Sequence, residues 1–339
     1  MQDDTFRLIT YQEQHDQSPN VLHPGLVIGD AIIALDGLAP SHPLAQQLEE
    51  RTHASLLTPG LQGLLFDWDR HFDMLSTLGE FVGLEGIEDP RRYRGTVSDQ
   101  RIHVLAPVLR PSKMLYAASN YAKHIAEAEN WQPSGRSQAQ GIDKAKTQPY
   151  SFLKLPSCIV GPYDPVVFPR GFAQLDYEVE LALVIGRRGK HIPEEHAMEY
   201  VAGFLIANDM SLRDLTVRQD WPNLRSDWFV GKNFDTSAPL GPYLVPRRFV
   251  PKFQDLRLTL RVNGVTKQDA STRDMIFSPQ EQIAFLSRFM TLEPGDILAT
   301  GTPSGVGFGT GDYLKVGDLV EAEIEGLGQQ RTRIIEKEA

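Results

Sequence analysis

The segment LDYEVELALVIG, residues 175–186, places the strongest constraint on the fold, because it has the apolar content of a buried strand and yet carries three acids. Side chains alternate across a strand with a period of two, so Asp176, Glu178 and Glu180 share one face while the apolar residues between them share the other. The segment is therefore predicted to be a strand that is apolar on one side and anionic on the other.

The composition is that of an ordinary globular protein and excludes several classes of partner. The chain has 339 residues, of which 41% are hydrophobic and 23% charged, which is enough for more than one domain. Acidic residues outnumber Lys and Arg by 44 to 34, and no basic run is long enough for binding to nucleic acid or an anionic membrane. The single cysteine, Cys158, rules out an intrachain disulfide, and no apolar run approaches the ~20 residues of a membrane span. We expect a cytoplasmic protein that acts on a small molecule.

The chain changes character near residue 105, where we place a domain boundary. Residues 1–105 combine strand-like segments such as PGLVIGDAIIAL with helical ones such as SHPLAQQLEERTH and LLFDWDRHFDMLSTLGEFVG, which predicts a smaller N-terminal α+β domain. Residues 106–339 are mostly strand and turn with short helices. Because strands and helices do not alternate regularly, a Rossmann arrangement has little support, and the predicted fold class is a β-rich α+β fold.

Local signals within residues 106–339 predict three features. RLTLRVNGVTKQD is typical of a hairpin, because Asn263–Gly264 tolerates the positive φ angles of a two-residue turn. SPQEQIAFLSRFM predicts a helix that begins with a capping box between Ser278 and Glu281. The polar, aperiodic segment at residues 132–148 predicts a mobile loop.

The acidic residues suggest a metal site. Glu178 and Glu180 lie two apart on one strand face, so their carboxylates repel each other unless a cation lies between them. Asp209 follows the apolar segment YVAGFLIAN, where a third carboxylate could face the first two. Oxygen ligands of this kind suit Mg²⁺, Mn²⁺ or Ca²⁺ better than zinc. The alternative is that these acids line the solvated face of an edge strand.

Three further motifs carry candidate chemistry. His124 and Glu127 are three apart at the start of a predicted helix, and a carboxylate beside an imidazole makes a general base, although an exposed His and Glu would give the same pattern. Lys232 lies among aromatic residues and either neutralises an anion or extends its amine to solvent. The Gly-rich turn TGTPSGVG, residues 300–307, could bind a carboxylate or enolate through its amides and hydroxyls, and it lacks the Gly-Lys-Ser/Thr ending of a P-loop.

The order of the motifs along the chain resembles the fumarylacetoacetate hydrolase family over residues 106–330. The matching motifs are H-x-x-E, E-x-E, N-D-M-S-x-R-D, G-K-N-F-D and G-T-P-x-G-V-G. This resemblance implies a C-terminal β-roll domain, a homodimer, and a divalent cation held by Glu178, Glu180 and Asp209. Mg²⁺ and Mn²⁺ are the expected cations, with Ca²⁺ as a further candidate.

The resemblance also implies roles for individual side chains. His124 with Glu127 would activate water, and Lys232 would help to stabilise the charge that develops on the substrate. The residues expected to contact the substrate are Tyr121, Lys154, Arg213, Thr216, Gly301 and Thr302.

The chain departs from the family pattern in two places. Where relatives commonly read S-A-R-D-x-Q, this chain has SLRDLT, so Arg213 is kept and Thr216 replaces a substrate-facing Gln. The N-terminal domain and the loop at residues 132–148 are longer than in compact family members, and the loop is a candidate lid. Substrate specificity therefore cannot be carried over from the family.

These features lead to a functional hypothesis with alternatives. The first expectation is a metal-dependent hydrolase that cleaves a carbon–carbon bond in a 1,3-dicarbonyl acid such as an acylpyruvate. The first alternative keeps the same metal site and enolate chemistry but decarboxylates oxaloacetate, or isomerises or hydrates an unsaturated 2-keto acid. The second alternative is a non-catalytic ligand-binding protein that retains the fold.

Overall fold

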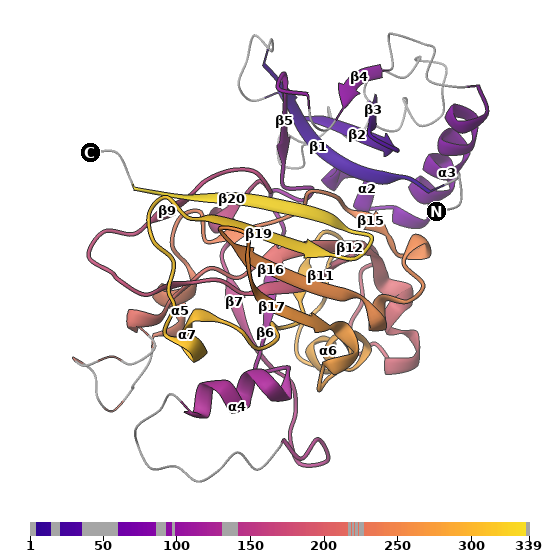
Figure 1. Cartoon of the computed structure of the whole chain (residues 1–339). Coiled ribbons are helices and arrows are strands. Elements are labelled where there is room, and N and C mark those ends of the chain that lie inside the picture. The colour runs from indigo at the N-terminus through magenta and orange to yellow at the C-terminus, as the bar shows by residue number, and fades with distance from the viewer. Residues whose placement is uncertain are drawn as a thin grey trace.

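The computed structural model describes most of the chain (Figure 1). The described residues are 5–14, 21–35, 60–85, 93–96, 99–130, 142–215, 218, 220, 223 and 227–336. The predicted helix in SHPLAQQLEERTH, residue Thr216 and residues 132–141 of the predicted loop lie outside them. Among the residues described, no helix is long and apolar enough to cross a membrane.

The first part of the chain builds an antiparallel five-stranded sheet in the order β4-β3-β2-β1-β5. Two helices, α2 and α3, follow β3 in the chain, and α3 packs against β2. The bounds of these elements are β1 (Arg7–Glu13), β2 (His23–Ile28), β3 (Ala31–Ala34), α2 (Gln62–Leu65), α3 (Trp68–Glu85), β4 (Tyr93–Thr96) and β5 (Ile102–Leu105). The mixture of strands and helices agrees with the expected α+β character, and the domain boundary at residue 105 stays a prediction.

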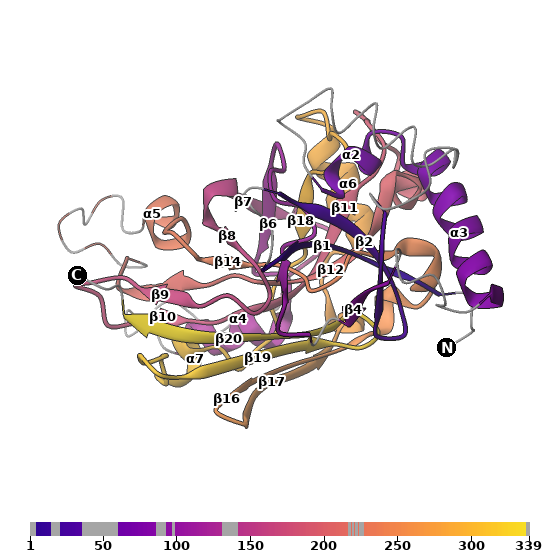
Figure 2. The ribbon, with the colours of Figure 1, turned by 90° about the horizontal axis from the view of Figure 1, so that it is seen from above.

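Two larger sheets form the rest of the fold, and they pack face to face through contacts of β11 and β12 with β16, β19 and β20. The six-stranded sheet has the order β15 (Val245–Pro246), β12 (Val201–Asn208), β11 (Val179–Ile185), β18 (Ile297–Ala299), β6 (Met114–Ala118), β7 (Tyr150–Lys154). The five-stranded sheet has the order β17 (Val265–Ser271), β16 (Arg257–Val262), β19 (Leu319–Ile324), β20 (Gly328–Glu336), β9 (Val166–Phe168). Figure 2 shows β16, β17, β19 and β20 together along one side of the molecule. The fold is the expected β-rich α+β fold.

Short elements complete the structure. The two-stranded pairs are β10 (Leu175–Asp176) with β13 (Ser211–Leu212), and β8 (Ile159–Val160) with β14 (Ala238–Pro239). The helices are α4 (Ala122–Asn130), α5 (Trp228–Lys232), α6 (Pro279–Ser287) and α7 (Gly307–Thr310). The 3₁₀ helices are η1 (Pro156–Cys158), η2 (Glu194–Tyr200), η3 (Arg213–Leu215), η4 (Arg247–Phe249), η5 (Phe253–Asp255) and η6 (Thr272–Asp274).

Two of the three local signals in the sequence, the hairpin and the capping box, are confirmed, and the mobile loop stays a prediction. Asn263 and Gly264, with φ angles of 51° and 79°, join β16 to β17 in an antiparallel hairpin. Ser278 accepts from the backbone of Glu281, whose side chain accepts from the backbone of Ser278, so the capping box is formed at the start of α6. Cys158 is buried and has a free thiol.

The prediction of one strand with an anionic face over residues 175–186 is wrong in two respects. The backbone leaves the sheet between Asp176 in β10 and Val179 in β11, so Asp176 does not share a strand face with the glutamates. Strand β11 is central in its sheet and buried on both faces, with Leu183 in one apolar cluster and Ala182 in the other. A central strand packed on both sides has no solvated face, which excludes the edge-strand alternative.

An ion pair joins the first sheet to the rest of the chain and gives a testable pH dependence. His103 on β5 lies 2.7 Å from an Asp164 carboxylate oxygen, and this hydrogen bond raises the pKa of His103 above its ordinary value. A raised pKa stabilises the fold fully below the unfolded-state value of about 6.5, and the effect is lost as the pH rises through the folded-state pKa. Since both groups are partly exposed, we expect less than about 1 kcal/mol. The melting temperature of His103→Gln should therefore fall below that of the wild type at about pH 5.5 and match it at about pH 8.5.

Candidate active site

Three buried carboxylates meet where β11 begins and β12 ends. The antiparallel pairing of Val179 with Asn208 places Glu178 and Glu180 beside Asp209, and the Asp209 amide donates to the Glu178 carbonyl over 2.9 Å. One carboxylate oxygen from each of the three acids lies within 4.8 Å of the other two. The structure thus brings together the predicted metal ligands, which we call the carboxylate triad.

Two buried lysines contact the triad. Lys232, at the end of α5, donates to Glu178 over 2.9 Å and to Asp209 over 2.5 Å. Lys154, at the end of β7, donates to the other oxygen of Asp209 over 2.6 Å and also to the carbonyls of Met210 and Ser237. Each of these lysines is at most 6% exposed, so Lys232 does not extend to solvent as the alternative interpretation required.

The ionic cluster around the triad carries an excess negative charge. Its four carboxylates and three cationic side chains leave one net negative charge when all are ionised; they are Asp176, Glu178, Glu180, Asp209, Lys154, Lys232 and Arg213. Burial raises the pKa of Glu178, but Lys232 and Arg213 outweigh burial and hold that pKa below its ordinary value. For Glu180, burial and then the neighbouring Asp209 and Glu178 raise the pKa well above its ordinary value.

These electrostatics fit a divalent cation. Within the described part of the chain, Glu180 accepts a single hydrogen bond, from the Gly301 amide over 2.8 Å, and no cationic side chain pairs with it. A buried carboxylate with so few partners is costly unless a cation lies beside it. Three convergent carboxylates are a suitable ligand set for a hard divalent ion. The triad therefore suits such an ion in both donor chemistry and charge.

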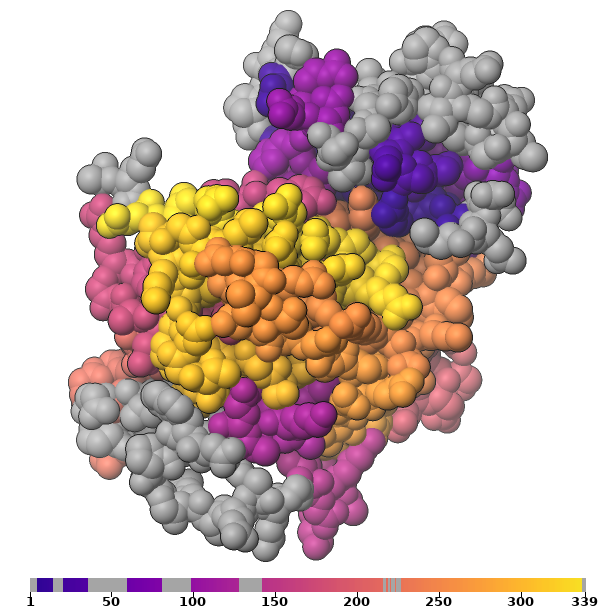
Figure 3. Space-filling view, viewed as in Figure 1, coloured from indigo at the N-terminus to yellow at the C-terminus, as the bar shows by residue number. Residues whose placement is uncertain are grey.

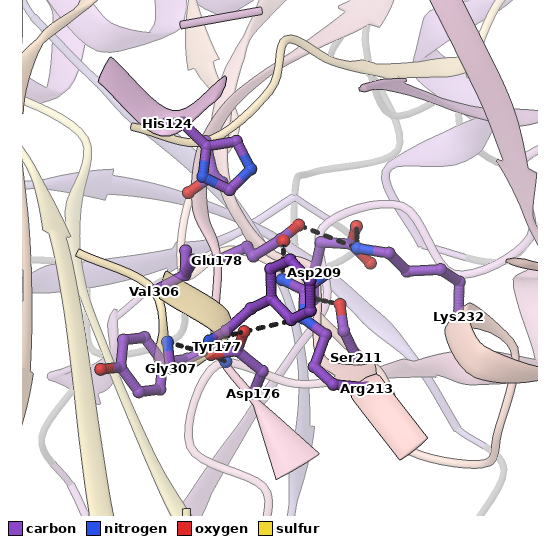
Figure 4. A network of polar contacts seen from close by, with 12 residues as sticks. His124, Asp176, Tyr177, Glu178, Asp209, Ser211, Arg213, Lys232, Val306 and Gly307 are labelled. Carbon is purple, nitrogen blue, oxygen red and sulfur yellow. Dashed lines mark hydrogen bonds and ion pairs between the residues drawn. The ribbon is translucent and has the colours of Figure 1, made fainter. Parts of the chain in front are cut away.

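His124 lies over the triad and forms no hydrogen bond with the part of the chain that the structure describes. It projects from α4, and Figure 4 shows its ring turned toward the Glu178 carboxylate. Its Nδ1 is buried and has no hydrogen-bond partner among the described residues, and the nearest Glu127 oxygen is 4.0 Å away. Burial lowers the pKa of His124, which favours the neutral imidazole at neutral pH. Glu127 instead accepts from the Gly305 amide at 3.1 and 2.9 Å.

The Gly-rich turn at residues 300–307 forms hydrogen bonds within the protein through its Gly301 amide and Thr302 hydroxyl. Its Gly301 amide donates to Glu180, and its Thr302 hydroxyl donates to the Val179 carbonyl over 2.9 Å. The groups expected to bind the substrate at these two positions thus already have partners. Arg213 is likewise engaged, with Asp176 over 2.8 Å and with Glu178.

Among the predicted contact residues that the structure describes, Tyr121 keeps a polar atom without a partner. Its side chain is 2% exposed, and its hydroxyl has no partner within the described residues. The side chain of Thr216 lies outside the described residues, so its predicted role stays a prediction. Of the predicted lid, residues 142–148 are described as turn and irregular structure.

Sequence reasoning missed several residues that shape the site. Asn120 donates to the carbonyls of Phe277 and Thr300 and accepts from the Phe277 amide. Gln268 accepts from the Val179 amide and donates to the Thr302 hydroxyl. The only sequence signal for Asn120 is its position directly before Tyr121 and His124, and Gln268 on a hairpin strand has none.

Comparison with known proteins identifies the family. The family model described as fumarylacetoacetate (FAA) hydrolase C-terminal matches residues 113–335. A mitochondrial oxaloacetate tautomerase of Rattus norvegicus is 43% identical over 230 residues, which cover 67% of this chain and 68% of the relative. An uncharacterized protein of Pyrococcus abyssi is 40% identical over 234 residues, covering 68% of this chain and 93% of the relative.

Solved structures extend the similarity to nearly the whole chain. A fumarylacetoacetate hydrolase from Exiguobacterium antarcticum superposes with a TM-score of 0.71 at 27% identity, covering 98% of this chain and 100% of the other. A maleylpyruvate hydrolase from a Sphingobium species, in complex with manganese(II) and pyruvate, superposes with a TM-score of 0.68 at 26% identity and the same coverage. The family match over residues 113–335 and the 43% identity together show that this chain belongs to the fumarylacetoacetate hydrolase family.

Proposed function

We propose that the protein catalyses proton transfer on an enolisable 2-oxo acid, and in particular the keto–enol tautomerisation of oxaloacetate or a closely related oxo diacid. The observation that carries this proposal is a buried imidazole at His124 that faces the triad and is not hydrogen-bonded to Glu127. Burial lowers the pKa of His124, which favours its neutral form. A tautomerase needs one base that can take up and return a proton, and a neutral imidazole meets that need. The relatives that are oxaloacetate tautomerases support the same chemistry.

The site residues have two roles in this reaction: some stabilise the negative charge of the enolate, and His124 transfers the proton. A divalent cation on the triad would stabilise negative charge on the 2-oxo oxygen as the enolate forms. Lys232, fixed against Glu178 and Asp209, adds positive charge in a buried site, where fixed charge has its largest effect. His124 takes up the enol O–H proton as the enolate forms and returns it to the carbon next to the 2-oxo group, and the reverse reaction moves the proton the other way. We propose Mg²⁺ or Mn²⁺ as the cation, while a homodimer and a cytoplasmic location stay predictions.

Hydrolysis of the carbon–carbon bond of an acylpyruvate is the second candidate. It is favoured by the presence of Glu127 three residues after His124, since a carboxylate that accepts from Nδ1 would orient the imidazole to activate water. The 4.0 Å separation is too long for that hydrogen bond, and the Glu127 carboxylate is held by the Gly305 amide instead. This geometry makes hydrolysis the second choice.

The two candidates separate in one assay. Freshly dissolved enol-oxaloacetate is incubated with the protein and Mg²⁺, Mn²⁺ or EDTA, and the loss of enol absorbance is followed. Malate dehydrogenase then measures keto-oxaloacetate, lactate dehydrogenase measures pyruvate, and an acylpyruvate series is tested for cleavage into two acids. We expect the enol to disappear in a metal-dependent reaction that forms keto-oxaloacetate and no pyruvate beyond the protein-free control. Formation of pyruvate from oxaloacetate would indicate decarboxylation, and cleavage of an acylpyruvate into two acids would indicate hydrolysis. A protein that binds the cation but converts none of these substrates would favour the ligand-binding alternative.

Variants of the helix α4 pair give a sharper test. We expect His124→Gln to lower the tautomerisation rate by about 10²- to 10⁴-fold with nearly unchanged cation affinity, because it removes the base and no ligand. Glu127→Gln should cost less than about tenfold, since His124 Nδ1 does not donate to this carboxylate and glutamine can still accept from the Gly305 amide. A normal rate in His124→Gln would refute the assignment of the base. Equal losses in both variants would favour the hydrolytic dyad.

A further inference from the structure

The sequence segment with three acids leaves one of them unexplained by the proposed chemistry. Asp176 is fully buried but is not part of the triad. One of its oxygens accepts from the amides of Tyr177 and Gly307 at 2.8 and 2.6 Å, and the other accepts from the Phe308 amide at 2.9 Å. Asp176 therefore fixes the first turn of α7 to the start of the 177–180 segment.

Arg213 connects this carboxylate to the triad. Its Nε donates to Asp176 over 2.8 Å, and its Nη2 donates to Glu178 (Figure 4). The guanidinium is planar and rigid, so a fork that holds both carboxylates fixes their relative positions. Any change in the position of Glu178 is thus transmitted to Asp176 through one inflexible group.

The 305–309 segment, which Asp176 holds through Gly307 and Phe308, also packs against α4. The Gly305 amide donates to both oxygens of Glu127, and the Tyr177 hydroxyl donates to the Gly305 carbonyl over 3.2 Å. Gly309 packs so closely that a Cβ there would lie 1.9 Å from Cγ of Glu127. Helix α4 contacts α7, and in Figure 3 the purple atoms of the α4 region lie directly below yellow and orange atoms of the C-terminal part of the chain. The same helix carries His124.

We propose that Asp176 is a positioning residue that couples the carboxylate triad to helix α4. A divalent cation that fixes Glu178 also fixes Arg213, Asp176 and the 305–309 segment, and this chain of contacts holds Glu127 and therefore the His124 imidazole in place. Cation binding and docking of α4 stabilise each other, because the same contacts serve both. The inference rests on the proposed role of His124 for its catalytic meaning, and its structural part is tested without turnover.

Hydrogen exchange measures the coupling directly. Amide exchange of residues 122–127 is recorded with EDTA and with saturating Mn²⁺ in the wild type, in Asp176→Asn and in Asp214→Asn. Asparagine offers an NH₂ group where Arg213 and the Phe308 amide need an acceptor, so it breaks the link. Asp214 is a matched control, because it also accepts from two backbone amides, those of Ala173 and Gln174, and contacts no residue of the triad.

We expect Mn²⁺ to slow exchange of 122–127 by about fivefold or more in the wild type and in Asp214→Asn, and by less than about twofold in Asp176→Asn. With active protein, Asp176→Asn should lower kcat with little change in KM at saturating Mn²⁺, because it moves the base and removes none of the three carboxylates of the triad. Gly309→Ala disturbs the contact between Gly309 and Glu127. It should therefore also remove the slowing of amide exchange at residues 122–127 by Mn²⁺, although Mn²⁺ still binds.

Two results would overturn the proposal. One is equal protection by Mn²⁺ in Asp176→Asn and the wild type, and the other is bound Mn²⁺ that leaves exchange of 122–127 unchanged in the wild type. Should Asp176→Asn fail to fold, Gly309→Ala decides by the same criterion. Because exchange is read without substrate, a protein inactive on oxaloacetate would count against the proposed function and leave this test valid.

Discussion

Glu180→Gln is expected to abolish tight divalent-cation binding and to lower turnover by about 10³-fold, while raising the stability of the cation-free protein. Glutamine keeps the shape and can still accept from the Gly301 amide, but it removes one negative charge from a cluster with an excess of negative charge. In the cation-free protein above about pH 4.3, Glu180 must either carry a buried charge without a cationic partner among the described residues or keep its proton at a cost in folding free energy. Glutamine avoids both costs, so the substitution should raise the free energy of unfolding by about 1 kcal/mol or more, or about 2–4 °C in melting temperature.

The sign of the pH dependence follows from the raised pKa of Glu180. The unfolded chain releases this proton near pH 4.3, whereas the folded protein holds it to higher pH because of burial and the neighbouring carboxylates. The wild type therefore loses stability as the pH rises above about 4.3, and Glu180→Gln does not. The gap between the two melting temperatures in EDTA should widen from acidic to neutral pH.

Calorimetric titration with Mn²⁺ and thermal melts in EDTA check these expectations. Glu323→Gln is the matched control, since Glu323 lies half-exposed on β19 and forms only a 3.5 Å ion pair with Arg261. That control should bind Mn²⁺ normally and change stability by less than about 0.5 kcal/mol. If Glu180→Gln bound Mn²⁺ as tightly as the wild type, the triad could not be the cation site.

Lys154→Met is expected to cause the largest loss of stability, about 3–5 kcal/mol in the cation-free protein. The ammonium is completely buried and donates to Asp209 over 2.6 Å and to the carbonyls of Met210 and Ser237 over 3.1 and 2.9 Å. Methionine fills a similar volume but donates nothing, so three buried acceptors lose a partner and the charge excess grows by one. Urea unfolding in EDTA measures the loss.

A divalent cation should restore part of this stability, because it supplies positive charge beside the same Asp209 carboxylate. The control is Lys144→Met, which removes a half-exposed lysine that pairs with Glu281 over 2.7 Å and should cost less than about 1 kcal/mol. An unfolding midpoint of Lys154→Met equal to that of Lys144→Met would show that the buried pair with Asp209 contributes little to stability.

The sequence predicted the features whose causes are local. Two glutamates at alternate positions must point the same way along a strand, and an aspartate that follows the neighbouring strand reaches the same sheet end, so Glu178, Glu180 and Asp209 could be named together. The hairpin at Asn263–Gly264 follows equally from backbone preferences within a few residues.

Tertiary structure alone decided which charges and amides meet. Lys154 reaches Asp209 across 55 residues of chain, and Glu127 accepts from Gly305 across 178 residues rather than from the histidine three residues away. Asp176, which the strand pattern grouped with the glutamates, instead holds Gly307 and Arg213. The physical reason is that such contacts depend on how separate sheets pack. Alternation within a strand fixes the direction of a side chain and carries no information about which distant segment lies there.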